Sequence, residues 1–297
     1  MEDQAAKLRQ LVGDETSKPK ESFFSGGDEK KTRVIAVTSG KGGVGKTNLT
    51  VNLAIAFGLL SQRVLVIDAD LGMANVDVVL GSLSKYHLLH LLDPDIKLSD
   101  VLIKGPYGVN YISGGSGIEK AKEFTADERS VLMDKLSGCG DIADIILVDT
   151  GAGLGKNVMD FILAADEVLL VTTPEPTALT DAYAVMKAYS MRAENKNIRL
   201  VVNRVYDESE SEDVVIKLNQ TSKKFLNMPV TAAGYIFEDR KVAAAVRKQK
   251  PFLAVEPDSL ASRCVKAMAE SLLYGGEMHI KQGWRGFLNQ IFNFSGK

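Results

Sequence analysis

The sequence predicts an α/β protein built on a doubly wound, mostly parallel sheet. Three observations predict it. Short apolar, β-branched runs alternate with helical patterns over about residues 31–275, a glycine-rich loop follows the first run, and carboxylates follow two later ones. The 297 residues are 45% hydrophobic, so the chain can bury one large core or two small ones.

The first predicted strand leads into a phosphate-binding loop. The strand is the apolar run Arg33–Ser39, and a helical pattern begins at Asn48. The predicted nucleotide-binding residues are Gly40, Lys41, Gly42, Gly43, Val44, Gly45, Lys46, Thr47 and Asn48. A strand, a glycine loop and a helix in this order direct backbone N–H groups toward one anion. We expect Lys46 to reach the β- and γ-phosphates and the Thr47 hydroxyl to ligate Mg²⁺.

Carboxylates follow the next two predicted strands. Asp68 and Asp70 follow the strand Arg63–Ile67, and Asp149 follows the strand Ile145–Val148. Because ligands of open parallel sheets bind at the carboxyl ends of strands, we expect the three side chains to converge beside the phosphates. There they would hold the Mg²⁺ shell or orient the attacking water. One such aspartate could be a turn residue, but three beside a phosphate loop favour the functional interpretation.

The remaining elements are predicted to be scaffold. Thr125 and Glu128 form a capping-box pattern at the start of a helix. Further strands are predicted at Val168–Val171, Ile198–Val202 and Val230–Ile236, and further helical segments at Ala243–Val246 and Leu260–Leu273.

Together, the lysine-rich phosphate loop, Asp68-Ala69-Asp70 and Asp149-Thr150-Gly151 resemble motifs of the deviant Walker A ATPases, the MinD/ParA class. The resemblance covers about residues 31–275 and implies a P-loop domain that hydrolyses ATP to ADP and phosphate, with ATP and Mg²⁺ as cofactors. It implies catalytic roles for Lys41, Lys46 and Asp70. Lys41 would reach across an ATP-dependent homodimer to the partner's phosphates, and Asp70 would position the hydrolytic water.

The same resemblance implies which residues lie near Mg²⁺ and which lie near the adenine base of ATP. Mg²⁺ would lie near Thr47, Asp68 and Asp149. Asn203 and Arg204 match the family's adenine-side motif, and residues 173–176 match a segment facing the nucleotide or the partner subunit. Both of these last matches also fit ordinary loop starts.

A C-terminal segment, residues 276–297, carries an apolar stripe at helical spacing. Its members are Ile280, Trp284, Phe287, Leu288, Ile291 and Phe292. Large aromatic residues flanked by sparse basic ones describe a helix that lies in the membrane interface. The alternative is a helix docked on its own core. A class member with such a tail binds membrane lipid as a dimer, and we expect the ADP-bound monomer to hide the stripe in a groove of its own surface.

Residues 1–30 combine a short helical pattern with a linker-like composition. Asp3-Gln4-Ala5, two residues and then Leu8-Arg9 resemble the N-terminal motif of the flagellar-number regulators of the class, named FlhG or YlxH. In these regulators the segment binds the signal-recognition-type GTPase FlhF and stimulates its hydrolysis. The resemblance implies that Gln4 enters the GTPase site and that Leu8 and Arg9 contact the partner. Components of the flagellar basal-body switch are further implied partners.

Composition separates the alternatives. A net charge of −2 speaks against a ParA-like DNA partition ATPase and against specific nucleic-acid binding. Cys139 and Cys264 lack the spacing of a metal pair, which disfavours an iron–sulfur carrier. A cell-division MinD would ordinarily lack the N-terminal motif, and a metabolic P-loop ligase would leave both end segments without a role. No apolar run is long enough to span a bilayer, so we expect a cytoplasmic protein that binds reversibly to the inner face of the membrane.

Overall fold

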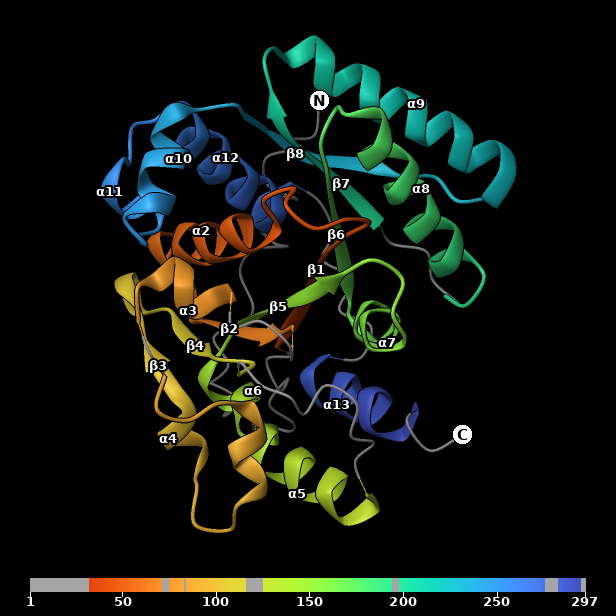
Figure 1. The fold of residues 1–297 in the computed structure, drawn as a ribbon. Coiled ribbons are helices and arrows are strands. Elements are labelled where there is room, and N and C mark those ends of the chain that lie inside the picture. The colour runs from red at the N-terminus through yellow and green to blue at the C-terminus, as the bar shows by residue number, and fades with distance from the viewer. Residues whose placement is uncertain are drawn as a thin grey trace, which may run out of the picture. The chain divides into compact units, whose positions relative to one another are not determined.

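A computed structural model describes residues 32–70, 75–82, 84–115, 125–193, 198–275 and 283–294. By its contacts the chain divides into Met1–Lys30 and Lys31–Lys297, and every described residue belongs to the second unit. That unit contains an eight-stranded sheet with the order β3-β4-β2-β5-β1-β6-β7-β8 (Figure 1). The strands are β1 (Arg33–Ser39), β2 (Val64–Ala69), β3 (Leu102–Lys104), β4 (Asn110–Ile112), β5 (Ile145–Ala152), β6 (Glu167–Thr172), β7 (Ile198–Val205) and β8 (Thr231–Phe237). Their pairings are parallel except for β3 with β4, which are antiparallel.

Helices cover both faces of the sheet, as the sequence predicts for a doubly wound fold (Figure 1). The described helices are α2 (Lys46–Leu59), α3 (Asn75–Leu80), α4 (Leu98–Val101), α5 (Ala126–Ser137), α6 (Cys139–Ile142), α7 (Lys156–Ala164), α8 (Pro176–Ser190), α9 (Glu208–Leu226), α10 (Arg240–Arg247), α11 (Phe252–Val255), α12 (Leu260–Tyr274) and α13 (Gly283–Phe294), with short 3-10 turns η1 (Leu88–Leu92) and η2 (Pro106–Gly108). Two apolar clusters fill the space between the sheet and its helices. One contains residues of α2, α11 and α12, and the other contains residues of α5, α7, α8 and α13.

Successive residues of the central strands alternate between these two clusters. On β1, Ile35 and Val37 belong to the cluster under α2, whereas Val34 and Ala36 belong to the cluster on the opposite face. All four side chains are fully buried. A parallel strand that is covered on both faces needs apolar residues at every position, because side chains alternate between the faces. This requirement explains the continuous apolar run that the sequence shows.

The strands extend further toward the phosphate loop than their apolar runs. β2 includes Asp68, which lies beside Asp149 of β5 in the sheet register. β7 continues to Val205, with a register irregularity between Asn203 and Val205. Polar residues continue these strands because their backbone still pairs with a neighbouring strand, which hydropathy alone does not reveal. The capping box at Thr125 is confirmed, since its hydroxyl accepts the Glu128 N–H at 3.2 Å.

The C-terminal helix α13 packs against α5, α7 and β1. Four of its stripe residues are buried in the apolar cluster on that face: Trp284, Phe287, Leu288 and Phe292. The indole N–H of Trp284 donates to the Leu136 carbonyl at 2.6 Å. The structure therefore has the docked arrangement that the sequence left open, and contact of these side chains with a membrane would require α13 to leave its groove.

Candidate nucleotide-binding site

The loop between β1 and α2 turns at two glycines with left-handed backbone angles. Gly43 has φ 82° and Gly45 has φ 95°, a region that residues with a Cβ rarely adopt. Gly45 is the N-cap of α2, and no side chain caps the first turn of that helix. Because the first N–H groups of a helix lack intrahelical partners, this turn is available to bind an anion.

Asp149 is the residue on which the first turns of α2 converge. Its side chain is fully buried. It pairs with Lys46 Nζ at 3.2 Å and accepts hydrogen bonds from the Thr47 hydroxyl at 2.6 Å and the Thr50 hydroxyl at 3.1 Å. A buried carboxylate with three donors is held in one orientation, because each donor compensates part of its lost hydration.

Asp68 lies beside Asp149 and organises the segment after β2. Burial, followed by the nearby charge of Asp149, raises the pKa of Asp68 to about 8. Its two carboxylate oxygens accept the backbone N–H groups of Asp70 at 3.0 Å and Val76 at 3.2 Å. Asp68 thus fixes both ends of a segment whose middle, residues 71–74, lies outside the described part of the chain.

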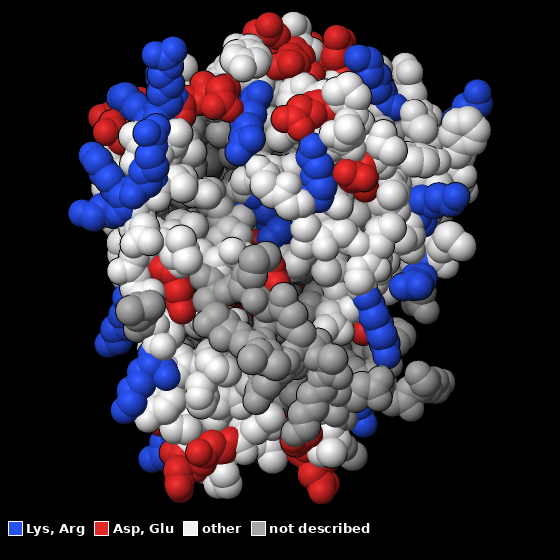
Figure 2. Space-filling model, viewed as in Figure 1, with Lys and Arg blue, Asp and Glu red and all other residues white. Residues whose placement is uncertain are grey.

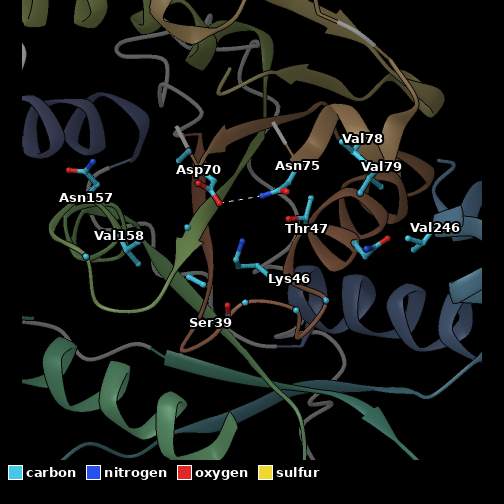
Figure 3. A pocket seen from close by; sticks show the side chains of 18 of the residues that line it. Ser39, Lys46, Thr47, Asp70, Asn75, Val78, Val79, Asn157, Val158 and Val246 are labelled. Carbon is cyan, nitrogen blue, oxygen red and sulfur yellow. Dashed lines mark hydrogen bonds between the residues drawn. The ribbon is translucent and has the colours of Figure 1, made fainter. Parts of the chain in front are cut away.

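A cleft of about 800 Å³ opens above these residues. Figure 3 shows Lys46 and Thr47 at its centre, with Asp70 and Asn75 on one side and Asn157 and Val158 of α7 on another. The Asn75 amide donates to the Asp70 carboxylate at 3.3 Å. Asp70 therefore lines the cleft that holds Lys46 and Thr47, as the sequence predicts.

Lys41 is not among the residues that line this cleft. Its Nζ pairs with Glu175 at 2.8 Å and donates a hydrogen bond to the Thr177 hydroxyl at 2.9 Å. The hydrogen bond from Lys41 holds the pKa of Glu175 below its usual value. Gly40, just before Lys41, lies so close to α8 that an added Cβ would stand 2.3 Å from the backbone carbon of Asp181. The start of the phosphate loop thus packs closely against α8, and its end contacts Asp149.

A second cavity of about 360 Å³ adjoins the cleft and shares Gly45, Asn48, Arg204 and Val246 with it. The amide of Asn203 donates to the Val44 carbonyl at 2.7 Å, and Arg204 adopts φ 62°. The cavity is lined in addition by the apolar residues Leu49, Ile236, Phe237, Val242, Ala243 and Phe252 and by the polar residues Asn203, Glu238, Asp239 and Arg247. A cavity that adjoins the phosphate loop and combines apolar side chains with a few polar ones suits the base of a nucleotide whose phosphates lie in the cleft.

Comparison with known proteins identifies the family. The model of the CobQ/CobB/MinD/ParA nucleotide-binding domain matches residues 35–252. The chain belongs to this MinD/ParA family. It is an ATPase whose cofactors are ATP and Mg²⁺.

Three relatives show how far the likeness extends. The antiactivator FleN of Pseudomonas aeruginosa is 39% identical over 83% of this chain and 88% of its own length. The flagellum site-determining protein YlxH of Helicobacter pylori is 33% identical over the full length of both chains. Among solved structures, the septum site-determining protein MinD of Pyrococcus horikoshii, in complex with Mg-ADP, is 29% identical with a TM-score of 0.65, covering 81% of this chain and 96% of that one.

The residues at the MinD/ParA site fit the cofactors. Among the described residues, no three His, Cys, Asp or Glu side chains form a cage for a metal ion. Mg²⁺ instead favours one or two carboxylates combined with phosphate oxygens and water, and Thr47 and Asp149 present their oxygens next to each other. The buried Asn48 Oδ1, which lies beside both cavities, has no hydrogen-bond partner among the described residues. An unpaired buried acceptor there is available to a ligand donor.

Three residues at the MinD/ParA site, Thr50, Asn75 and Thr177, were missed by sequence reasoning. Thr50 follows Lys46 by one helical turn, so spacing alone could have placed it beside Asp149. Asn75 reaches Asp70 from a helix after the undescribed segment. Thr177 binds Lys41 from 136 positions along the chain. Glu175 lies in the predicted segment 173–176, but its contact with Lys41, 134 positions away, was not predicted. No local pattern predicts such a partner.

Some predicted residues lie outside the described part of this MinD/ParA chain. They are Gln4, Leu8 and Arg9 of the N-terminal motif and Ile280 of the C-terminal stripe. Within the described residues, none of the helices combines the length and apolar character required to cross a bilayer.

Proposed function

We propose that this chain is an ATP-switched regulator of flagellar number or placement that acts as a homodimer at the membrane surface. Its similarity to the antiactivator FleN and, over both full lengths, to the flagellum site-determining protein YlxH supports the flagellar role. The septum site-determining relatives match a smaller share of this chain than YlxH does, for example 81% for the protein of Synechocystis. The match over both end segments favours the flagellar proposal over a role in cell division.

Each residue of the cleft has a role in this proposal. The loop from Gly40 to Asn48 and the Lys46 ammonium bind the phosphates, and Thr47 and Asp149 would hold Mg²⁺, which supplies charge neutralisation at the β- and γ-phosphates. Asp68 keeps the following segment in place through two backbone N–H groups. Asp70 orients the attacking water, since it lines the cleft without a lysine or arginine partner among the described residues. Asn203 and Arg204 border the base.

The position of the Lys41 side chain is the observation that supports the proposed homodimer. Its ammonium group lies outside its own cleft, fixed by Glu175 and by Thr177 at the first turn of α8. A phosphate-loop lysine held on the outside is placed to complete the cleft of a second copy. Hydrolysis then requires association, because each site obtains one positive charge from its partner.

Two lysine variants test this arrangement. We expect Lys46→Ala to lose both ADP binding and ATP turnover, because Lys46 lies inside the cleft and pairs with buried Asp149. Lys41→Ala should keep ADP binding by the monomer and lose turnover. Isothermal titration with Mg-ADP and steady-state phosphate release measure the two effects. A Lys41→Ala protein that hydrolyses ATP at the normal rate would remove the lysine from the proposal.

A mixing experiment separates action within one chain from action across a dimer. Lys41→Ala and Asp70→Ala proteins should each be inactive. Mixed, they form heterodimers in which one site has its own Asp70 and receives Lys41 from the other chain. We expect partial recovery of turnover on mixing. If Lys41 served its own site, no site in the mixture would contain both groups, and activity would stay absent.

The membrane and partner steps need separate measurements. Two α13 helices on one dimer would bind lipid more tightly than one, because the second binds at high effective concentration. Co-sedimentation with anionic liposomes should therefore require a non-hydrolysable ATP analogue, and should fail with ADP and with Lys41→Ala. The N-terminal segment would stimulate the signal-recognition-type GTPase FlhF, so a Gln4→Ala protein should lose stimulation of that GTPase and retain its own ATPase.

A further inference from the structure

The nucleotide cleft and the groove that holds α13 lie on opposite faces of the same two strands. On β2, Ile67 lines an apolar cavity under α13, and the next residue, Asp68, faces the nucleotide side. On β5, Val148 lines that cavity, and the next residue, Asp149, binds Thr47. Successive strand residues point to opposite faces. The sheet therefore places the nucleotide site and the docking groove one residue apart along the chain.

Helix α7 connects these two faces. Its first residues, Lys156, Asn157 and Val158, line the nucleotide cleft (Figure 3). One turn later, Phe161 stacks on Phe287 of α13, with ring centroids 6.2 Å apart and planes 23° apart. Because a short helix moves as one body, a shift of its first turn is carried to Phe161.

Phe287 also contacts a second aromatic residue within α13. It stacks on Trp284 with ring centroids 5.3 Å apart and planes 16° apart. Trp284 carries the donor that anchors α13 to Leu136, and the preceding residue, Gly283, donates its N–H to the buried Asp166 at 3.3 Å. The aromatic stack thus ends at the polar attachment of α13.

The docking groove is incompletely filled. A cavity of about 70 Å³ remains between α13 and the core, and all the surface that lines it is apolar. Its wall includes Phe161 and Phe287. A cavity without polar groups stays dry, and side chains around it lack part of their packing contacts. The gap lies among α13, α5, η1 and the strands β2 and β5, and Phe161 is the residue of α7 that borders it.

We propose that α7 is the mechanical link between the nucleotide site and the tail, with Phe161 as its contact to α13. An ATP-bound cleft displaces the first turn of α7 and withdraws Phe161 from Phe287, which releases α13. By thermodynamic reciprocity, docked α13 holds α7 in place and lowers the affinity of the cleft for an ATP analogue. The inference rests on the proposed membrane switch and adds the residues through which nucleotide controls it.

The fluorescence of Trp284, the single tryptophan of the chain, can be used to follow the docking of α13. Trp284 is 3% exposed, so its emission reports on α13 alone. In the full chain we expect a red shift when a non-hydrolysable ATP analogue and Mg²⁺ are added. Phe161→Ala should reduce that shift. Leu88→Ala is the matched control, because Leu88 lines the same cavity from η1, an element with no residue in the cleft. It should retain the shift.

A double-mutant cycle tests the reverse direction, from the docked α13 to the affinity of the cleft. Affinity for the ATP analogue is measured in the wild type, Phe161→Ala, Phe287→Ala and the double variant. The link predicts tighter binding in each single variant and no further gain in the double variant. Additive effects, or unchanged affinity in both single variants, would overturn it. If wild-type Trp284 emission stays fixed although the analogue drives dimerisation, nucleotide does not release α13 and the membrane switch itself fails.

Discussion

Asp149 shows how much of the site depends on one buried side chain. It joins Lys46, Thr47 and Thr50 of α2 to the end of β5, and it lies beside Asp68 of β2. Removing one donor leaves the others in place but leaves part of the carboxylate without compensation for its lost hydration. The position of the phosphate loop therefore depends on hydroxyl groups as well as on the lysine.

Thr50→Val tests this dependence. The substitution preserves shape and removes the hydroxyl that donates to Asp149, so we expect a loss of about 1–3 kcal/mol in the free energy of unfolding, together with weaker Mg-ATP binding. Urea denaturation and calorimetric titration measure the two effects. Thr180→Val is the control, because Thr180 makes the same helical contact to a carbonyl four residues earlier but is exposed on α8. An equal loss in both variants would mean that Asp149 does not need Thr50.

Gly45→Ala tests the end of the loop. An added Cβ would stand 2.3 Å from the Asn203 amide nitrogen, at a position with φ 95°. We expect a loss of the Asn203–Val44 hydrogen bond and of most affinity for Mg-ADP, in addition to roughly 1–3 kcal/mol of backbone strain. Gly108→Ala is matched in backbone angle, with φ 75°, but its Cβ would meet nothing within 4 Å. That control should be less stable and still bind nucleotide, as titration with Mg-ADP can establish.

At this scale the sequence predicts contacts within a motif and misses those between distant segments. Lys46, Thr47 and Asp149 meet as expected, because a strand, loop and helix fix the first two and β5, which lies beside β1 in the sheet, carries the third. The contact of Lys41 with Glu175 was not predictable in the same way. It depends on α8 lying beside the loop, and that placement follows only from the folded sheet.

Among the elements, α13 is the one whose placement depends most on other parts of the chain. Its apolar stripe is a correct prediction, but a stripe of this kind suits a membrane surface or a protein groove equally well. The groove is built from α5, α7 and β1, which come from three separate parts of the chain. Periodicity in one segment carries no information about such a surface elsewhere. The docked arrangement could therefore only be stated as one of two alternatives.

Trp284→Phe should loosen α13 without removing its apolar contact. The variant leaves the Leu136 carbonyl without the indole donor, which costs about 1 kcal/mol, or roughly a fivefold increase in the population of the undocked helix. Amide hydrogen exchange over residues 284–292 should accelerate accordingly. Arg285→Ala is the control, since Arg285 is exposed beside the stripe. Unchanged exchange in Trp284→Phe would show that apolar packing alone holds the helix.

For the whole molecule, the doubly wound class follows from the sequence but the strand order does not. β3 and β4 have three residues each, too few for a recognisable pattern, and they add the antiparallel edge. The charge distribution agrees with composition, because Figure 2 shows acidic and basic side chains interspersed over the face in view. A mixed surface gives little attraction for the DNA backbone, in contrast to what a DNA partition ATPase requires.

The division of the chain at Lys30 predicts that the N-terminal segment is separable. Because the contacts of Met1–Lys30 and Lys31–Lys297 form two units, we expect a protein that begins at residue 31 to keep its ATP turnover and melting temperature. Only the proposed stimulation of the GTPase FlhF should disappear. Calorimetry and phosphate release on the two lengths of chain provide the measurement. A large fall in melting temperature would show that the segment contributes to the ATPase unit.

The two cysteines allow local opening of the fold around α6 to be followed by chemical modification. Burial raises the pKa of Cys139 to about 12, so this thiol on α6, which packs against α13, stays protonated and inaccessible to alkylating reagents. Cys264 on α12 is partly exposed. The rate of Cys139 alkylation would therefore report how often the region around α6 and α13 opens. The alkylation rate of Cys264 in the same molecule would serve as the internal reference.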